Sequence, residues 1–296
     1  MKTMTVQKNK RVEWVDVLRP KEADVAALKK KFGLHSVIAD ELKGPSARAR
    51  MDHYDDYLFF VYYFPHYDKK NETSVRTEID FLVSKDTVAT IHYEPVTEAL
   101  RSFRVGEEKT SLMLLYNLIG HLIVFEDREL RHVREKVEAI SRELFRDRER
   151  EVLVRIARLK RDVSESRIVA RLQEPVFQSL ISKGAEFWGD DAEIYLSDLA
   201  GEHLKILRQL ADYRDAISDF EDTNNQLMNV KINTAMRTFT ALSFLTFPFV
   251  LIAAVFSMHA ADTPLVGTPG GFWIIVGAMA VGILLLVIYF RRKKWF

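Results

Sequence analysis

Two long stretches near the C-terminus carry no charged side chain. They run from Thr238 to Ala261 and from Thr263 to Phe290, and only Asp262 separates them. Each contains a run of about 20 mostly apolar residues, which as a helix can cross the roughly 30 Å hydrocarbon core of a bilayer. The pattern predicts two transmembrane helices, at residues 238–258 and 272–290. A buried helical hairpin of a soluble protein is the alternative, and the lack of a polar face on either run argues against it.

The first third of the chain has the pattern of a small α/β domain. Residues 11–17 alternate like a strand, and a helical pattern then opens at Pro20 and closes at Gly33. Runs rich in β-branched and aromatic residues predict further strands at 57–64, 75–84 and 87–93. After Pro95 the sequence is almost wholly helical. We therefore expect an α+β membrane protein with a cytoplasmic α/β domain over residues 1–95.

Residues 126–171 are highly charged but keep a narrow apolar seam. Asp, Glu, Lys and Arg occupy 25 of these 46 positions. Apolar residues recur every three to four positions, at Leu130, Val133, Val137, Ile140 and Leu144 and again at Val152, Ile156, Leu159 and Val163. This spacing predicts helices with one buried stripe and one solvated face. We expect a cytoplasmic helical hairpin within residues 96–195.

The next segment predicts one unusually long helix. Neither Gly nor Pro occurs between Gly201 and Pro248, so a helix of about 46 residues, roughly 70 Å long, could run into the first span. Its apolar seam has heptad-like spacing, with the members Leu196, Leu199, His203, Ile206, Leu210, Tyr213, Ile217, Phe220, Asn224 and Leu227. A seam of this length requires neighbouring helices, which is consistent with an oligomeric stalk over residues 196–237.

Close to the first span the same helix is polar without being charged. The residues concerned are Asn224, Asn225, Gln226, Asn229, Asn233, Thr234, Thr238 and Thr240. Amides and hydroxyls suit a water-filled lumen for a hydrated cation, because they bond the hydration shell without trapping the ion. Hydrogen bonding between packed stalk helices explains any single one of these residues equally well.

Basic residues flank the two spans on one side only. Lys231 and Arg237 precede the first span, and the basic tail at 291–296 follows the second, whereas the loop at 259–271 has one acid and no base. By the positive-inside rule, both termini are cytoplasmic. The N-terminus lacks the apolar core of a signal peptide. We expect a multi-pass protein of the cell (inner or plasma) membrane.

Composition narrows the function mainly by exclusion. The 296 residues include 43 basic and 42 acidic side chains, and the charge runs alternate in sign, which argues against nucleic acid as a partner. Without cysteine there is no disulfide scaffold, thiolate zinc site or iron–sulfur centre. The motifs GxGxxG, GxxxxGK[ST], HExxH and GxSxG do not occur in the sequence. We therefore expect no enzyme, no catalytic residues and no resident cofactor.

The C-terminal hundred residues contain the segment YRDAISDFEDTNNQLMNVKINTAMRTFTALSFLTFPFVLIAAVFSMH and the basic ending RRKKWF. In these segments the chain resembles the CorA family of divalent-cation channels. The N-terminal part agrees more weakly, through VEWVDVLRP, HSVIADEL, DHYDDYLFFV and TVATIHYE. The resemblance implies a homopentamer in which each subunit supplies an α/β domain, a stalk helix that continues as the pore-lining first span, and a second span in an outer ring.

The resemblance also implies which residues line the pore. Family members end the first span with Gly-Met-Asn, whose Asn ring binds the hydrated ion, and the matching residues here are Ser257, Met258 and His259. The spacing assigns the inner pore asparagine to Asn233 and keeps the proline of the first span as Pro248. The implied lining residues are Asn233, Phe239, Thr240, Phe247, Val250 and Ala254. The two phenylalanines could form apolar constrictions that gate by dewetting.

The change of Asn to His259 alters the chemistry at the pore mouth. An amide suits the waters of Mg²⁺, whereas imidazole nitrogen suits Zn²⁺, Ni²⁺, Co²⁺ or Cu²⁺. Imidazole also titrates near neutral pH, so a ring of protonated histidines would repel cations in acid. Alternatively, His259 faces lipid headgroups or the loop and has no role in selection.

Two acids complete the predicted sites. Asp262 in the outer loop would form a ring of carboxylates at the pore mouth of an oligomer, or it is a turn residue ahead of Thr263-Pro264. The resemblance implies a regulatory metal site between cytoplasmic domains, and Asp198 is its nearest match on the stalk. The acidic cluster at Asp52, Asp55 and Asp56 is explained more simply as a hydrated loop.

The functional prediction is a divalent-cation channel of the CorA type. It would carry Mg²⁺, with Co²⁺ and Ni²⁺ as further substrates, and the same ions would act as regulators. The alternatives are a Zn²⁺ transporter with a His259 filter, and a membrane-anchored metal sensor or scaffold that no longer conducts.

Overall fold

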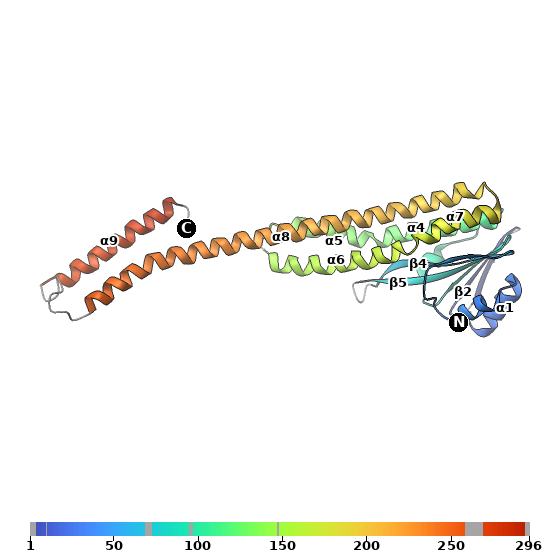
Figure 1. Ribbon diagram of the computed structural model, residues 1–296, viewed down its shortest axis with the longest axis horizontal. Helices are drawn as coiled ribbons and strands as arrows, with labels where there is room; N and C mark the ends of the chain where they lie inside the picture. Colours follow the sequence, from blue (N-terminus) through green and yellow to red (C-terminus); the bar gives the residue numbers. More distant parts are fainter. Residues whose placement is uncertain are drawn as a thin grey trace. The chain divides into compact units, whose positions relative to one another are not determined.

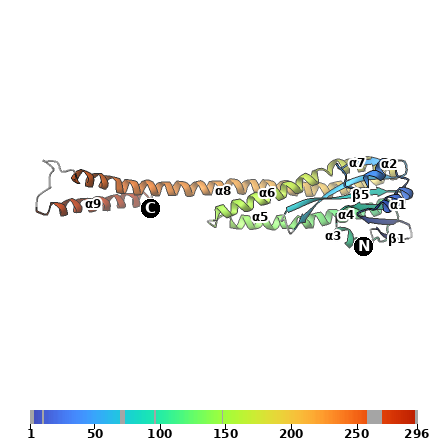
Figure 2. The ribbon, with the colours of Figure 1, turned by 90° about the horizontal axis from the view of Figure 1, so that it is seen from below.

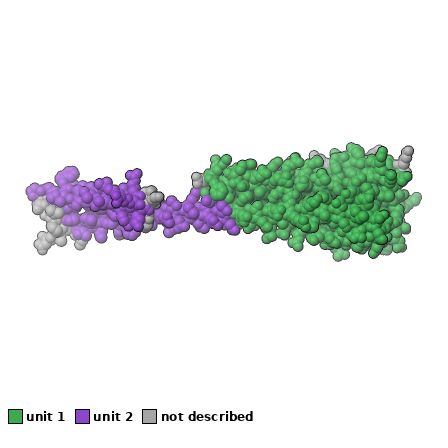
Figure 3. Space-filling view, turned by 90° about the horizontal axis from the view of Figure 1, so that it is seen from above, with its two compact units in different colours: residues 1–221 green, residues 222–296 purple. Residues whose placement is uncertain are grey.

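The computed structural model describes residues 4–9, 11–68, 73–94, 97–146, 148–257 and 269–293. The chain divides into two compact units, residues 1–221 and residues 222–296, drawn in green and purple in Figure 3. Helix α8 (Ala192–Ser257) contributes residues to both.

Unit 1 is built on a six-stranded mixed sheet. Its strand order is β1-β2-β6-β5-β4-β3, and only the β2–β6 pair is parallel. The strands are β1 (Met4–Lys8), β2 (Glu13–Leu18), β3 (Met51–His53), β4 (Leu58–Asp68), β5 (Thr73–Val83) and β6 (Thr87–His92). The four strands expected from the sequence are β2, β4, β5 and β6. The two that were not expected, β1 and β3, are the short edge strands.

Helices cover both faces of this sheet (Figure 1). The short helices α1 (Glu22–Phe32) and α2 (Ser36–Glu41) pack on one face, where Leu28 and Ile38 join Phe59, Val61 and Leu82 in a single core. Gly33 ends α1 with a φ of 67°, a conformation that favours glycine. The other face is covered by α4 (Ser111–Glu129), α6 (Glu149–Arg171) and α7 (Glu174–Trp188). Alternate strand residues thus point to opposite faces of the sheet.

The charged segment after α4 forms the expected helical hairpin. Helix α3 (Thr97–Ser102) precedes α4, and α5 (Arg131–Glu143) follows it and packs on α6. Figure 2 shows α5 and α6 running side by side. Eight of the nine seam residues are buried, and Val137 is half-buried.

Helix α8 has 66 residues and a length of about 100 Å, close to the stalk and first span expected over residues 196–258. It starts before Gly201 and continues past Pro248, so neither residue ends the helix. The buried part of its seam packs on the chain's own helices: Nε2 of His203 lies 2.9 Å from the carbonyl oxygen of Ala170. The seam up to Ile217 therefore does not require a neighbouring subunit. The length of this seam, from which an oligomeric stalk was expected, is thus no argument for oligomers.

Unit 2 pairs the end of α8 with α9 (Gly271–Arg292). Both helices are long and apolar enough to cross a membrane. They contact each other at Phe249 and Gly282, where a Cβ on the glycine would lie 3.1 Å from the phenylalanine ring. The absence of a side chain at Gly282 therefore allows the two helices to pack closely.

Candidate ion pathway along α8

The hydroxyl groups near and within the first span share one arrangement. Each donates its hydrogen to the carbonyl oxygen four residues earlier in α8. The residues are Thr234, Thr238, Thr240, Ser243 and Thr246, with oxygen–oxygen distances of 2.8 to 3.0 Å. The donor of each hydroxyl is thus satisfied inside the helix, which makes the group tolerable in a bilayer. The hydroxyl oxygen can still accept a hydrogen bond from water.

One face of the first span packs on α9 and the opposite face does not. Ala241 is buried, and Leu245, Phe249 and Phe256 are half-buried, which marks the packed face. The predicted lining residue Phe247 is 74% exposed. Since successive residues are 100° apart around the helix, Phe247 lies on the face opposite to the packed one.

Four predicted lining residues follow one line along α8. Asn233, Thr240, Phe247 and Ala254 are each seven residues apart, so they lie almost above one another over about 31 Å. All four are exposed in the single chain. A second line runs parallel to it and is formed by Met236, Ser243, Val250 and Ser257. We call the two lines together the exposed stripe.

The second line of the exposed stripe adds two residues that the sequence reasoning did not select. Ser243 and Met236 share the face of Val250 and Ser257. Their seven-residue spacing from Val250 is the signal that could have identified them. Phe239 borders the stripe and is 70% exposed.

The predicted filter lies mostly outside the described residues. Ser257 is the last residue of α8, whereas Met258, His259 and Asp262 are not described. Pro248 lies inside the helix at the level of the stripe. Because proline has no N–H group, the carbonyl oxygen of Phe244 loses its usual donor there.

Asp198, the predicted regulatory residue, is exposed on α8. The hydroxyl of Tyr116 on α4 donates a hydrogen bond to its Oδ2 at 2.7 Å, and this bond raises the pKa of the tyrosine. Among the described residues, no group of three or more His, Asp or Glu side chains could hold a metal ion. Of the acidic cluster expected in a hydrated loop, Asp52 lies in β3 and pairs with Arg50 at 2.7 Å, whereas Asp55 and Asp56 are exposed between β3 and β4.

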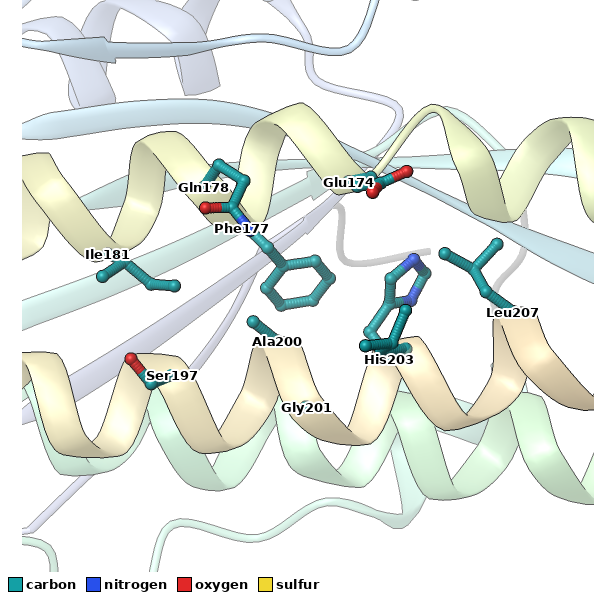
Figure 4. A pocket seen from close by; sticks show the side chains of 10 residues that line it. Glu174, Phe177, Gln178, Ile181, Ser197, Ala200, Gly201, His203 and Leu207 are labelled. Atoms are coloured by element: carbon teal, nitrogen blue, oxygen red, sulfur yellow. The ribbon is translucent and has the colours of Figure 1, made fainter.

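A hollow of about 260 Å³ lies between α7 and α8 within unit 1, beside the seam histidine (Figure 4). The ring of His203 stacks on Phe177 with a centroid distance of 4.9 Å. Burial lowers the pKa of His203 to about 4, so the imidazole is neutral at pH 7. His203 therefore packs as an uncharged core residue.

A family profile described as "CorA-like Mg2+ transporter protein" matches residues 9–292. The chain belongs to this CorA-like family. The cobalt/magnesium transport protein CorA of Thermotoga maritima is 22% identical to it, over 95% of this chain and 83% of the relative. The protein of the same description from Methanocaldococcus jannaschii is 23% identical, over 96% of this chain and 92% of the relative.

The solved structures include the complete CorA magnesium transporter of Methanocaldococcus jannaschii. It matches 98% of this chain and 93% of its own with a TM-score of 0.84, at 21% sequence identity. The CorA fold expected from the sequence is therefore confirmed: an α/β domain, a helical hairpin, a long stalk helix and two apolar helices. The roles of the individual CorA site residues stay predictions.

Proposed function

We propose that five copies of this chain form a channel that carries Mg²⁺ across the cell membrane, with Co²⁺ as a second substrate. The exposed stripe on α8 is the observation that carries the proposal. It combines uncharged oxygens at Asn233, Thr240 and Ser243 with apolar side chains at Phe247 and Val250. Membership of the CorA-like family and the names of the relatives agree with this substrate class.

A single stripe cannot enclose a lumen, so the pathway requires several copies. In a ring of five, each α8 turns its stripe inward while α9 packs behind it. The basic residues Lys231, Arg237, Arg291 and Arg292 lie on one side of the two spans. We propose that this side, with both termini, is cytoplasmic.

The stripe is suited to an ion that keeps its water. The waters around Mg²⁺ turn their hydrogens outward and therefore need acceptors, which the hydroxyl oxygens of Thr240 and Ser243 and the amide oxygen of Asn233 supply. The exposed stripe contains no carboxylate, which would bind the cation tightly and hold it in place. Farther along, a ring of Phe247 side chains narrows the lumen without any polar group, so it can close by excluding water.

Ser257, Met258 and His259 form the filter in this proposal. The neutral imidazole of His259 has one acceptor nitrogen, which takes the place of an amide oxygen toward the waters of Mg²⁺. Asp262 of each copy adds a carboxylate at the outer mouth, which raises the local cation concentration. The relatives named for magnesium and cobalt do not favour a zinc carrier or a non-conducting scaffold.

Asp198 is the proposed cytoplasmic contact of a regulatory cation. Since the described residues of one chain assemble no metal-binding group, the other ligands would come from the next copy. Tyr116 holds the carboxylate in place on the surface of unit 1. Divalent cations are thus both the substrate and the regulator.

Flux into vesicles that contain the purified full chain tests the proposal. Thr240→Val removes a hydroxyl from the stripe, and Thr238→Val removes one with the same internal hydrogen bond from the opposite face of α8. We expect Mg²⁺ flux to fall several-fold for Thr240→Val and to persist for Thr238→Val. Equal fluxes for the two variants would reject the stripe as the pathway.

The ions themselves test the filter. Mg²⁺, Co²⁺, Ni²⁺ and Zn²⁺ are compared for the wild type and for His259→Ala. We expect Mg²⁺ flux in the wild type and a loss of flux in acid that the variant does not share. If only Zn²⁺ passed, the proposed substrate Mg²⁺ would be wrong and a softer ion would take its place. If none of the four ions passed, the proposal of a channel would be rejected.

A further inference from the structure

The end of the α5–α6 hairpin carries an exposed aromatic ring. Phe145 is 72% exposed, and it is the only exposed phenylalanine among the described residues of unit 1. It lies between α5 and α6, two residues beyond the end of α5. Its neighbour Leu144 is buried in the seam, so the exposed ring is not needed to close the hairpin. We call residues 142–146 and 148–150 the hairpin tip.

Arginines surround this ring. Residues 142–161 contain eight basic and four acidic side chains, whereas residues 1–237 as a whole contain slightly more acids than bases. Arg142, Arg146, Arg148 and Arg150 of the hairpin tip are all exposed. Part of the opposing charge is neutralised or hidden, because Glu143 pairs with Arg155 on α6 and Glu149 is buried. Within the described part of the chain, Arg146 and Arg150 form no ion pair.

The hairpin tip lies at the end of unit 1 where α8 leaves it. Helix α6 runs antiparallel to α8, since Ala170 contacts His203 and Lys160 pairs with Glu221 at 2.6 Å. From Lys160, the chain needs about 16 Å of helix to reach the start of α6 at Glu149. From Glu221, α8 needs about 25 Å to reach Thr238, where the uncharged span begins. Only a short segment of α8 therefore connects unit 1 to the first apolar span.

We propose that the hairpin tip binds the headgroups of anionic phospholipids. Phe145 would enter the interfacial layer, where an aromatic ring is favourable, and Arg146 and Arg150 would bind phosphate oxygens through their planar guanidinium groups. Each arginine near an anionic surface adds to the electrostatic attraction. In an oligomer, the tips of all copies would act together, which strengthens binding without any further contact. The positive charge of the hairpin tip and the short connection from unit 1 to the first apolar span favour lipid over a second protein.

Quenching of tryptophan fluorescence by lipid tests this contact on the full chain in vesicles. Phe145→Trp is measured with brominated phosphatidylglycerol, and Val37→Trp, at a position that is 61% exposed on α2, is the matched control. The emission of the wild-type protein, which has four tryptophans, is the baseline. Vesicles with the same lipid in both leaflets make the result independent of the orientation of the chain.

We expect quenching at least twofold stronger for Phe145→Trp than for Val37→Trp in vesicles that contain phosphatidylglycerol. Adding Arg146→Gln and Arg150→Gln should remove the difference. Equal quenching of Phe145→Trp and Val37→Trp would overturn the proposal. Quenching of Phe145→Trp by brominated phosphatidylcholine alone, as strong as by brominated phosphatidylglycerol, would also overturn it. A blue-shifted emission of Phe145→Trp without quenching would also overturn it, because the ring would then lie against another protein surface.

Discussion

Nε2 of His132 on α5 lies 2.8 Å from Oδ2 of Asp162 on α6. The backbone N–H and the hydroxyl of Ser74 on β5 donate to the other oxygen of the same carboxylate, at 3.0 and 2.7 Å. A single buried side chain thus ties the two hairpin helices to the sheet. Burial by itself would raise the pKa of Asp162, but the hydrogen bonds from His132 and Ser74 and the charge of Lys136 lower it to about 2.

Asp162→Asn should lower the stability of the full chain by about 1–3 kcal/mol at neutral pH, because the charge-assisted hydrogen bonds are lost. Since folding lowers the pKa of Asp162, its contribution is present above about pH 4 and disappears as the pH falls toward 2. The apparent melting temperature in detergent measures both effects. Glu165→Gln, an exposed acid on the same helix, is the control and should change little. A variant as stable as the wild type would contradict this role.

Glu126 on α4 should make the stability of the chain depend on pH in the direction opposite to Asp162. The side chain is 1% exposed, and neither carboxyl oxygen has a hydrogen-bond partner among the described residues. Burial, with a smaller effect of Asp127, raises the pKa of Glu126 to about 8. The folded state therefore keeps a proton that the unfolded state has already lost at neutral pH.

Stability should therefore fall as the pH rises from about 4.5 to about 8, by on the order of 3 kcal/mol at pH 7. Glu126→Gln should remove this slope, because the amide does not titrate. Melting temperatures across the same range measure it, with Glu135→Gln on the exposed face of α5 as the control. If Glu126→Gln kept the slope of the wild type, another group would be responsible.

Two glycines in unit 1 should respond with opposite signs to alanine. A Cβ at Gly184 on α7 would lie 2.3 Å from the buried side chain of Leu196 on α8, whereas one at Gly201 meets no atom within 4 Å. Gly184→Ala should lower stability by about 1–3 kcal/mol through overpacking. Gly201→Ala should raise stability by up to about 1 kcal/mol, since alanine favours the helix. Chemical denaturation of both variants measures the difference, and equal shifts would be inconsistent with close packing at Gly184.

The contact between the two spans offers a test inside the membrane. Gly282→Val places a branched side chain against the ring of Phe249, while Gly277→Val on the same helix adds one where a Cβ would meet nothing within 4 Å. We expect only Gly282→Val to lower the melting temperature, by an amount equivalent to about 1–3 kcal/mol. A similar loss for Gly277→Val would mean that the branched residue, and not the contact, causes the effect.

Periodicity predicted most of the architecture because burial on one side leaves a regular trace. The seam of α8 is an example: Leu199, Ile206 and Leu210 are buried, as their spacing indicates. Edge strands leave no such trace. In β1, Val6 is 52% exposed, so the strand lacks the alternation that identifies β2. Helix α8 passes Gly201 and Pro248 although both disfavour a helix locally, because packing and the membrane setting outweigh them.

The site was less accessible to sequence reasoning. The resemblance to the CorA family supplied the line from Asn233 to Ala254, and its intervals of seven residues place these four on one face of a helix. It could not reveal that Tyr116 binds Asp198, because the two residues are 82 positions apart. Nor does the sequence distinguish Glu126, a buried acid, from the solvated acids beside it. The hydrogen bond of Asp198 and the burial of Glu126 both depend on contacts between segments that are far apart in the sequence.

The internal hydrogen bonds of Thr240 and Ser243 have a consequence for anions. With the hydroxyl hydrogens turned back into the helix, these two side chains present only lone pairs outward. The water molecules around chloride turn their oxygen atoms outward and need hydrogen-bond donors, which these groups do not offer. A lumen lined by them would discriminate by the sign of the permeant charge although the lining itself is neutral.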